Sequence, residues 1–260
     1  MSESALRELN LVALRDFPLI QPGDDLAGLI KECLIENRII LQDGDVIVIA
    51  QKVISKAEGR QICLETVHPK DQALELARLT GKDPRLVELI LQESNQVLRT
   101  RPGLIVVEHR LGFVCANAGI DRSNVSQQEL QEESVLLLPE NPDLSAGKIR
   151  ARLEEDFAAR LGVLVIDSHG RAWRNGTVGI TIGLSGLPGV VDLRGEPDLF
   201  GYRLQTTEIA AADELAAGAS LLMGQADESS PVVHVRGFPY NLRESAFGEL
   251  PRERESDLFR

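Results

Sequence analysis

The chain has 260 residues, of which 43% are hydrophobic, 26% are charged and 4% are aromatic. That length and hydrophobic content can bury a large core, which excludes a mostly disordered chain. The formal net charge of −12 argues against a general nucleic-acid-binding protein, whose surface is usually basic, although a local basic pocket can persist in an acidic protein.

Membrane insertion and secretion are not indicated by the sequence. There is no apolar run of roughly 18 residues, the length that a transmembrane helix needs. Residues 1–10 are charged and lack the apolar stretch of a secretory signal. We therefore expect a cytoplasmic protein that neither spans nor binds a membrane.

The cysteines Cys33, Cys63 and Cys115 lie far apart, each in apolar surroundings. Their number and spacing match neither a disulfide framework nor a zinc site. We expect them to be free thiols buried in the core.

The amino-terminal third predicts a helix followed by a buried strand. Apolar residues recur at helical spacing over 26–34, after the turn residues Pro22-Gly23-Asp24. Residues 46–50 form an uninterrupted apolar run, typical of a strand buried on both faces. Gln51 and Lys52 follow this strand, and Lys56 comes four residues after Lys52. These lysines would lie where α/β proteins bind ligands, although a solvated turn is an equally good interpretation.

Two helices and a hairpin are predicted next. Pro69 and Gly81 bracket the first helix, and Asp83-Pro84 opens a second that runs to about Asn95. Residues 104–108 and 112–115 then read as a hairpin. Asp121 follows its second strand.

A helix and strand then lead to a second acid. Ser145 can cap a helix with an apolar face that Gly162 stops. Residues 163–166 read as a buried strand that ends at Asp167. An acid thus follows a strand twice, and magnesium is usually held by one or two carboxylates with phosphates and water. We predict that Asp121 and Asp167 form a metal site.

The last third alternates glycine-rich, helical and polar segments. Glycines interrupt a strand-forming stretch at 176–189, which indicates close approach of either a ligand or, more commonly, another backbone. Thr206 or Thr207 can cap a helix that runs to Leu222-Met223 and breaks at Gly224. A polar loop at 225–230 precedes a strand at 232–235, and residues 243–260 form a charged tail expected to be peripheral.

Common catalytic signatures do not occur. The sequence has no P-loop, no GxGxxG after the early strand, no GxSxG elbow and no local zinc spacing among its histidines. His169 lies two residues after Asp167. A loop histidine beside an acid is more often a surface hydrogen-bonding group than a catalyst, so we favour the surface role.

Five ordered blocks nevertheless carry a family resemblance. They are FPLI at 17–20, VISKAEGR at 53–60, NAGIDRSNV at 117–125, DSHGR at 167–171 and LLMG at 221–224. Together they span almost the whole chain, and the chain resembles the coenzyme F420-0:L-glutamate ligase family. The resemblance implies a GTP-dependent ligase that adds L-glutamate to the phospholactyl deazaflavin coenzyme F420-0, and then further γ-linked glutamates, through an acyl phosphate.

The resemblance also implies the fold and the cofactors. The fold would be mixed α/β, a single ligase-like domain over 1–260 with two interlocked subdomains, and the protein would be a homodimer. Mg²⁺ or Mn²⁺ would assist, with K⁺ as a further ion. Such ions neutralise the charge that develops in phosphoryl transfer.

Site residues follow from the matched blocks. Asp121, Asp167 and Ser168 would be metal ligands, and Asp121, Asp167 and Lys56 would be catalytic. Contacts to GTP would come from Pro18, Leu19, Ile20, Gln51, Lys52, Lys56, Asn124, Met223, Gly224 and Gln225. Two positions depart from the family: Ser168 stands where threonine is common, and Gln225 puts a neutral oxygen in a loop that is usually acidic.

Arg171 and Arg174 are added on chemical grounds alone. Arginine holds phosphate and carboxylate groups through paired hydrogen bonds, so either residue could bind the anionic phospholactyl group. Surface salt bridges are an equally good interpretation.

Two other functions remain open. A metal-dependent phosphohydrolase would use the same acids and release phosphate without glutamate. A non-catalytic GTP-binding regulatory protein would bind nucleotide without turnover, and the altered loop after Gly224 is the sequence feature that suggests it.

Overall fold

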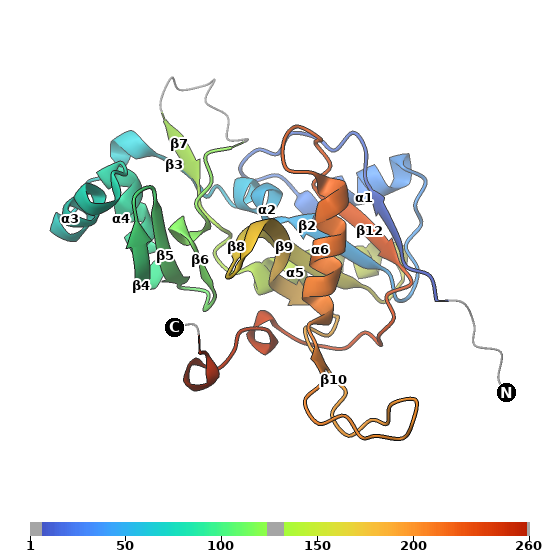
Figure 1. Ribbon diagram of the computed structural model, residues 1–260. Coiled ribbons are helices and arrows are strands. Elements are labelled where there is room, and N and C mark those ends of the chain that lie inside the picture. The colour runs from blue at the N-terminus through green and yellow to red at the C-terminus, as the bar shows by residue number, and fades with distance from the viewer. Residues whose placement is uncertain (1–6, 124–132, 259–260) are drawn as a thin grey trace.

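The computed structural model describes residues 7–123 and 133–258. Its largest sheet in those residues has five strands in the order β1-β12-β2-β8-β9. These strands are β1 (Asn10–Ala13), β12 (Val232–Arg236), β2 (Val46–Ala50), β8 (Gly162–Arg171) and β9 (Arg174–Ser185). β2 and β8 are parallel, and the other neighbours are antiparallel. The protein is therefore mixed α/β, as expected (Figure 1).

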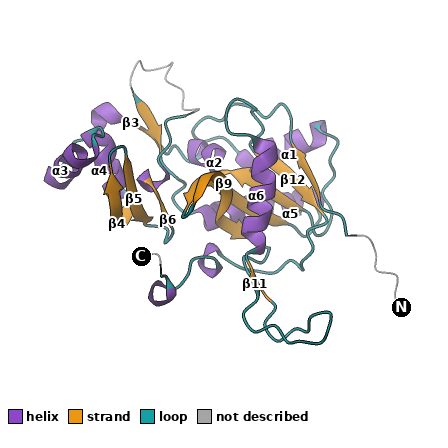
Figure 2. Cartoon of the chain, viewed as in Figure 1, coloured by secondary structure: helices purple, strands orange, loops and turns teal. Residues whose placement is uncertain are grey.

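Helices cover both faces of this sheet (Figure 2). Ile47 and Ile49 of β2 pack in one apolar cluster with α1 (Leu26–Glu36) and α5 (Pro142–Phe157). Val46 and Val48 point the other way, into a second cluster with α6 (Ala211–Met223). Successive strand residues face opposite sides, so an unbroken apolar run needs a cover on each. The prediction for 46–50 is confirmed.

A smaller α/β unit, named here the α3–β6 unit, comprises residues 71–116. It contains α3 (Asp71–Thr80), α4 (Pro84–Gln92) and the sheet β4 (Ser94–Arg101), β5 (Leu104–His109) and β6 (Val114–Ala116). Figure 1 shows it beside the five-stranded sheet. Two short strands, β3 (Gln61–Cys63) and β7 (Ser134–Leu136), pair with each other, and in the chain β3 precedes the α3–β6 unit and β7 follows it. The two predicted helices and the hairpin are confirmed, but β4 begins at Ser94, so the second helix is shorter than predicted.

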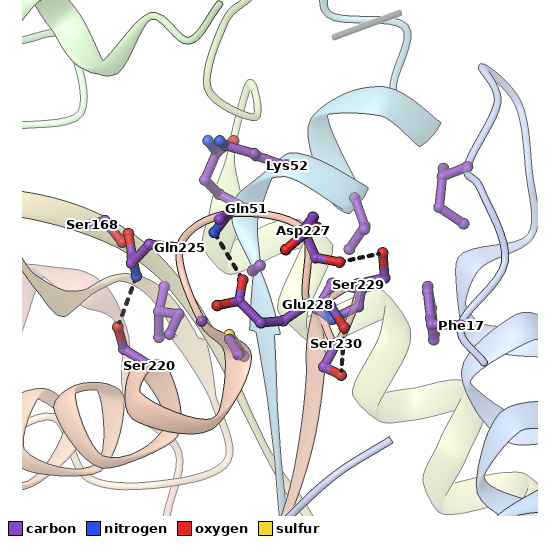
Figure 3. A pocket seen from close by; sticks show the side chains of 18 of the residues that line it. Phe17, Gln51, Lys52, Ser168, Ser220, Gln225, Asp227, Glu228, Ser229 and Ser230 are labelled. Carbon is purple, nitrogen blue, oxygen red and sulfur yellow. Dashed lines mark hydrogen bonds between the residues drawn. The ribbon is translucent and has the colours of Figure 1, made fainter. Parts of the chain in front are cut away.

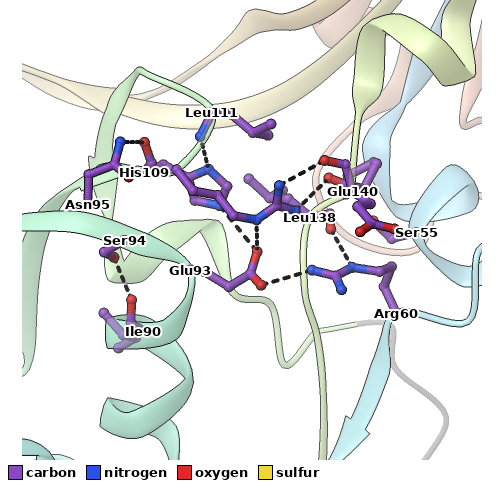
Figure 4. A network of polar contacts seen from close by, with 12 residues as sticks. Ser55, Arg60, Ile90, Glu93, Ser94, Asn95, His109, Leu111, Leu138 and Glu140 are labelled. Atoms are coloured by element: carbon purple, nitrogen blue, oxygen red, sulfur yellow. Dashed lines mark hydrogen bonds and ion pairs between the residues drawn. The ribbon is translucent and has the colours of Figure 1, made fainter.

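A buried ionic network joins the α3–β6 unit to the main body (Figure 4). Glu93 accepts from Arg60 Nη2 at 3.0 Å and from Arg110 Nε at 2.9 Å, and His109 Nε2 lies 3.6 Å away. Arg60 Nε also donates to the Leu138 carbonyl at 3.0 Å. Burial alone would raise the pKa of Glu93, but these donors and positive charges hold it at about 2.

Three further predicted helix boundaries were wrong. Asn141 caps α5, because its side-chain oxygen accepts from the Leu144 N–H, and Ser145 lies inside the helix. The helix ends at Ala158, which adopts a left-handed φ of 50°, whereas Gly162 starts β8. α6 begins after Ala210, because Thr206 and Thr207 precede the short strand β11 (Glu208–Ile209), which pairs with β10 (Val191–Asp192). Its predicted end at Gly224 is confirmed.

The glycines of β9 allow close packing. A Cβ on Gly179 would lie 2.6 Å from the Ala216 carbonyl oxygen of α6. On Gly183 it would lie 2.6 Å from the Pro142 backbone at the start of α5. Tight backbone packing, the commoner of the two interpretations offered above, accounts for both positions.

The three cysteines differ in burial. Cys33 and Cys115 are buried, Cys63 is half-buried and none of the three forms a disulfide within the described residues, so full burial was wrong only for Cys63. In the charged carboxy-terminal segment, Phe247 is buried and its N–H donates to Asp143. No helix in the described ranges is long and apolar enough to span a membrane.

Candidate functional site

A cavity of about 350 Å³ opens at the carboxyl ends of the parallel strands β2 and β8. Ligands of open α/β sheets bind outside such strand ends, because neighbouring strand ends and the loops after them converge there. Four segments line the cavity, as Figure 3 shows: residues 17–20, residues 50–56 at the β2–α2 junction, residues 166–168 of β8, and residues 220–231.

Lys52 and Lys56 lie on a helix and not in a solvated turn. Gln51 and Lys52 begin helix α2 (Gln51–Ala57) directly after β2, so the solvated-turn interpretation was wrong. Lys52 and Lys56 both line the cavity. Burial and the neighbouring Lys52 charge lower the pKa of Lys56. A bound anion would stabilise the charged form of Lys56 and so oppose both effects, which suits Lys56 to bind phosphate.

Asp121 lies near the cavity and is held by residues that line it. It follows β6 and the short helix η2 (Asn117–Gly119), and its backbone pairs with Leu136 in both directions at 2.9 Å. Gln51 Nε2 donates to Asp121 Oδ2 at 3.2 Å, and Lys52 Nζ lies 3.4 Å from the same oxygen. The buried Gln51 side chain is itself fixed, because its Oε1 accepts from Ser55 Oγ at 2.9 Å.

Asp167 reaches the cavity from the sheet. The prediction that the strand ends there was wrong, because β8 continues to Arg171 in its pairing with β9. The parallel pairing with β2, however, ends at Ala50 and Ile166. Asp167 is thus the first β8 residue beyond the end of β2, and this exposes its carboxylate to the cavity.

The charge of Asp167 acts on the Asp121 carboxyl group. Burial raises the pKa of Asp121, the Lys52 charge opposes this, and the nearby Asp167 charge raises it further. Two like charges brought together without full neutralisation favour a cation between or beside them. The metal site predicted at Asp121 and Asp167 stays a prediction, and both acids lie near Lys52, which lines the cavity with Asp167 and is paired with Asp121.

His169 was placed wrongly by sequence reasoning. It lies inside β8, not in a loop, and only 7% of its surface is exposed. Its Nε2 lies 2.8 Å from Asp167 Oδ2. The surface role is therefore excluded.

The loop after α6 closes the cavity. Gly224 adopts φ 70° and ψ −172°, and a Cβ there would collide with the Glu228 carboxyl group. Glu228 Oε2 accepts from the Ala226 N–H at 2.8 Å, and Gln225 Nε2 donates to Ser220 Oγ at 3.3 Å (Figure 3). The sequence analysis named Gln225 of this loop as a site residue, but it missed Asp227 and Glu228, which also line the cavity. Their acidity beside Gly224 was the available signal.

The other predicted site residues fall into three groups. Most line the cavity: Pro18, Leu19, Ile20, Gln51, Lys52, Lys56, Asp167, Ser168, Met223, Gly224 and Gln225. Arg171 and Arg174 lie exposed at the end of the β8–β9 hairpin and do not line it. Asn124 lies outside the described residues.

The donor set suits a hard divalent cation with additional ligands. Among the described residues no three His, Cys, Asp or Glu side chains gather as a complete metal site. Two carboxylates and the Ser168 hydroxyl provide oxygen donors, and magnesium commonly completes its shell with water and substrate phosphates. The residues therefore fit Mg²⁺ or Mn²⁺ held jointly with a nucleotide.

Comparison with known proteins gives concordant matches. A family model described as F420-0:Gamma-glutamyl ligase matches residues 15–237. Coenzyme F420:L-glutamate ligase of Methanothermobacter thermautotrophicus is 48% identical over 97% of this chain and 99% of its own length. The proteins of the same name from Methanocaldococcus jannaschii and Methanopyrus kandleri are 43% and 47% identical, over 98% and 86% of this chain and 98% and 84% of their own lengths.

Proposed function

Because the chain belongs to the F420-0:gamma-glutamyl ligase family, we propose that it is an enzyme that joins L-glutamate to coenzyme F420-0 and uses GTP. The observation that carries this is one cavity lined by Asp167, Lys52 and Lys56, with Asp121 beside it and paired with Lys52 at 3.4 Å. Carboxylates that hold a cation and lysines that hold phosphates are the groups that phosphoryl transfer requires.

The proposed chemistry has two steps. An oxygen of the lactyl carboxylate of F420-0 attacks the γ-phosphorus of GTP, the bond to the β-phosphate oxygen breaks, and GDP leaves. The amine of glutamate then attacks the acyl carbon, an amine proton is lost to base, and phosphate departs with the C–O electron pair. The products are the amide, GDP and phosphate.

The nucleotide would occupy the cavity. Lys52 and Lys56 would contact its phosphates, while residues 17–20 and 223–225 would line the rest of its site. The partly apolar 17–20 segment includes Phe17 and Ile20, which are buried and hold that wall in place. In phosphoryl transfer the protein acts mainly by positioning groups and stabilising charge.

Asp121, Asp167 and Ser168 would hold Mg²⁺ or Mn²⁺. Such an ion supplies neutralisation of the phosphate charge that grows in the transition state. K⁺ is a further proposed ion, by family resemblance. Homodimer formation is proposed on the same basis.

The acceptor would approach from outside the cavity. Arg171 and Arg174, at the end of the hairpin that also carries Asp167, remain our candidates for the phospholactyl group. Four residues of extended strand cover about 13 Å, which places Arg171 within reach of a long acceptor whose carboxylate lies at Asp167.

A mass-spectrometric assay tests the proposal. Protein is incubated with F420-0, L-glutamate, GTP and Mg²⁺ or Mn²⁺, and each component is omitted in turn. We expect a product heavier by one or more glutamyl units that requires every component. Asp121→Asn and Asp167→Asn should each lower its formation by at least about 100-fold, since losing a ligand of the charge-neutralising ion costs several kcal/mol.

Asp71→Asn, on the exposed face of α3, is the matched control and should retain full activity. Phosphate release that needs neither glutamate nor acceptor would favour a phosphohydrolase. GTP binding without turnover under any metal would favour a regulatory protein.

A further inference from the structure

The buried histidine beside Asp167 has no part in the chemistry described above. His169 is 93% removed from solvent, and its Nε2 lies 2.8 Å from Asp167 Oδ2. A carboxylate can only accept, so Nε2 carries the hydrogen and donates it. Nδ1 has no hydrogen-bond partner among the described residues.

The ring of His169 is held by the α3–β6 unit. Phe113, at the β5–β6 turn, packs against it with ring centroids 5.3 Å apart and planes inclined by 49°. Phe113 is in turn stacked on His109 at 5.0 Å and meets the edge of Phe247 at 5.7 Å. A ring fixed by packing on this scale has little rotational freedom, so its N–H points in one direction.

In both Asp121 and Asp167, neighbouring side chains contact one of the two carboxylate oxygens. Gln51 and Lys52 approach Oδ2 of Asp121, and His169 donates to Oδ2 of Asp167. Within the described residues, no hydrogen bond reaches Oδ1 of Asp167. The carboxylate is thus oriented through one oxygen while the other stays free for a ligand.

We propose that His169 is a positioning residue that orients the Asp167 carboxylate for the divalent cation. The inference rests on the proposed function, because that function places the cation at Asp167. Groups that hydrogen-bond to metal ligands fix their orientation, and losing one typically weakens metal binding by about 10–100-fold.

Two amide substitutions separate positioning from packing. In His169→Gln the side-chain amide nitrogen can take the place of Nε2, whereas in His169→Asn it lies near the place of Nδ1 and falls short of Asp167. Both variants put a neutral amide in the same buried site. A purely structural role would make them similar, and a positioning role makes them different.

The measurement is Mn²⁺ affinity in the presence of GDP, which cannot turn over, by isothermal titration calorimetry. Wild type, His169→Gln, His169→Asn and Asp167→Asn are compared, with thermal melting to establish that each is folded. We expect His169→Asn to bind Mn²⁺ about 10–100-fold more weakly than wild type, and His169→Gln to recover most of that loss.

Equal affinity of His169→Asn and wild type would overturn the proposal. Equal weakness of the two amide variants would also overturn it, since the donor position would then not matter. So would Mn²⁺ binding that is unchanged in Asp167→Asn. The ligation assay is run separately, and its failure in wild type would refute the proposed function without deciding the role of His169.

Discussion

Gln51 is a single side chain whose two ends have different partners. Its amide nitrogen donates to Asp121, and its amide oxygen accepts from Ser55. The hydroxyl of Ser55, which is fully buried, therefore decides which end of the amide faces the carboxylate. If the amide turned over, an oxygen would face Asp121 and repel it.

Replacing Ser55 by alanine should loosen this arrangement. We expect Ser55→Ala to lower ligation kcat/KM by about tenfold, as for other partners of metal ligands. It should also lower the free energy of unfolding by about 1–3 kcal/mol, because the buried Gln51 oxygen loses its donor. Steady-state kinetics and urea unfolding measure the two effects. Unchanged kinetics would show that the Gln51 amide keeps its orientation without Ser55.

Single residues differ in how far the sequence predicts them. Asp121 and Asp167 could be singled out because an acid beside an apolar run is a local pattern. His169 was misplaced, because its burial depends on Phe113, which lies in another part of the chain. Asp227 and Glu228 were missed because loop residues have no periodicity that shows which way they point.

At the scale of elements, β8 shows why strand ends are hard to predict. Its apolar run stops at Ile166, where its pairing with β2 ends, but its pairing with β9 continues to Arg171. Hydrophobic pattern reports burial, whereas strand length is set by backbone pairing with a partner. The helix starts failed for a similar reason: Asn141, Ser145, Thr206 and Thr207 are all good capping residues, and tertiary context selects among them.

The glycine at position 179 gives a test of packing between elements. In Gly179→Ala the new Cβ would meet the Ala216 oxygen at 2.6 Å and Ser220 Cβ at 2.5 Å, so α6 must shift. We expect a loss of about 1–3 kcal/mol in unfolding free energy, the usual cost of overpacking. Because α6 ends at the cavity loop, GTP affinity should fall as well.

Gly170→Ala is the matched control for this change. Gly170 lies on β8, in the same hairpin, and a Cβ there would have no atom within 4 Å. Its stability should equal wild type within about 0.5 kcal/mol. Equal destabilisation of the two variants would attribute the effect to the loss of glycine itself and not to α6.

At the scale of the whole molecule, two buried carboxylates hold distant parts together. Glu93 joins the α3–β6 unit to the main body. Asp45, which is 2% exposed, accepts from His234 Nε2 at 2.8 Å and from Arg236 Nε at 2.9 Å. Burial alone would raise the pKa of Asp45, but the donors Arg236 and His234 hold it at about 2.

These groups predict how stability depends on pH. The pKa of each is lower in the folded than in the unfolded state, so each stabilises fully above its ordinary pKa of 3.8 or 4.5. That stability is lost as the pH falls toward about 2, by roughly 2–3.5 kcal/mol for each group.

Urea unfolding between about pH 6, above the ordinary carboxyl pKa values, and about pH 2, near the folded ones, should therefore show a steep fall in stability. Asp45→Asn and Glu93→Gln should each start less stable at pH 6 and show a shallower fall. A slope equal to wild type in both variants would mean that other carboxylates control the acid transition.

The position of Asp121 links folding and chemistry. Asp121 lies beside the cavity on the segment that follows the α3–β6 unit, whereas Asp167 lines the cavity from the five-stranded sheet. Neither acid, and neither part of the molecule, contains the site alone. Local opening of the α3–β6 unit would separate Asp121 from Asp167 and abolish activity while the five-stranded sheet stayed intact. Activity would then require that this unit be docked, so that only completely folded molecules are active.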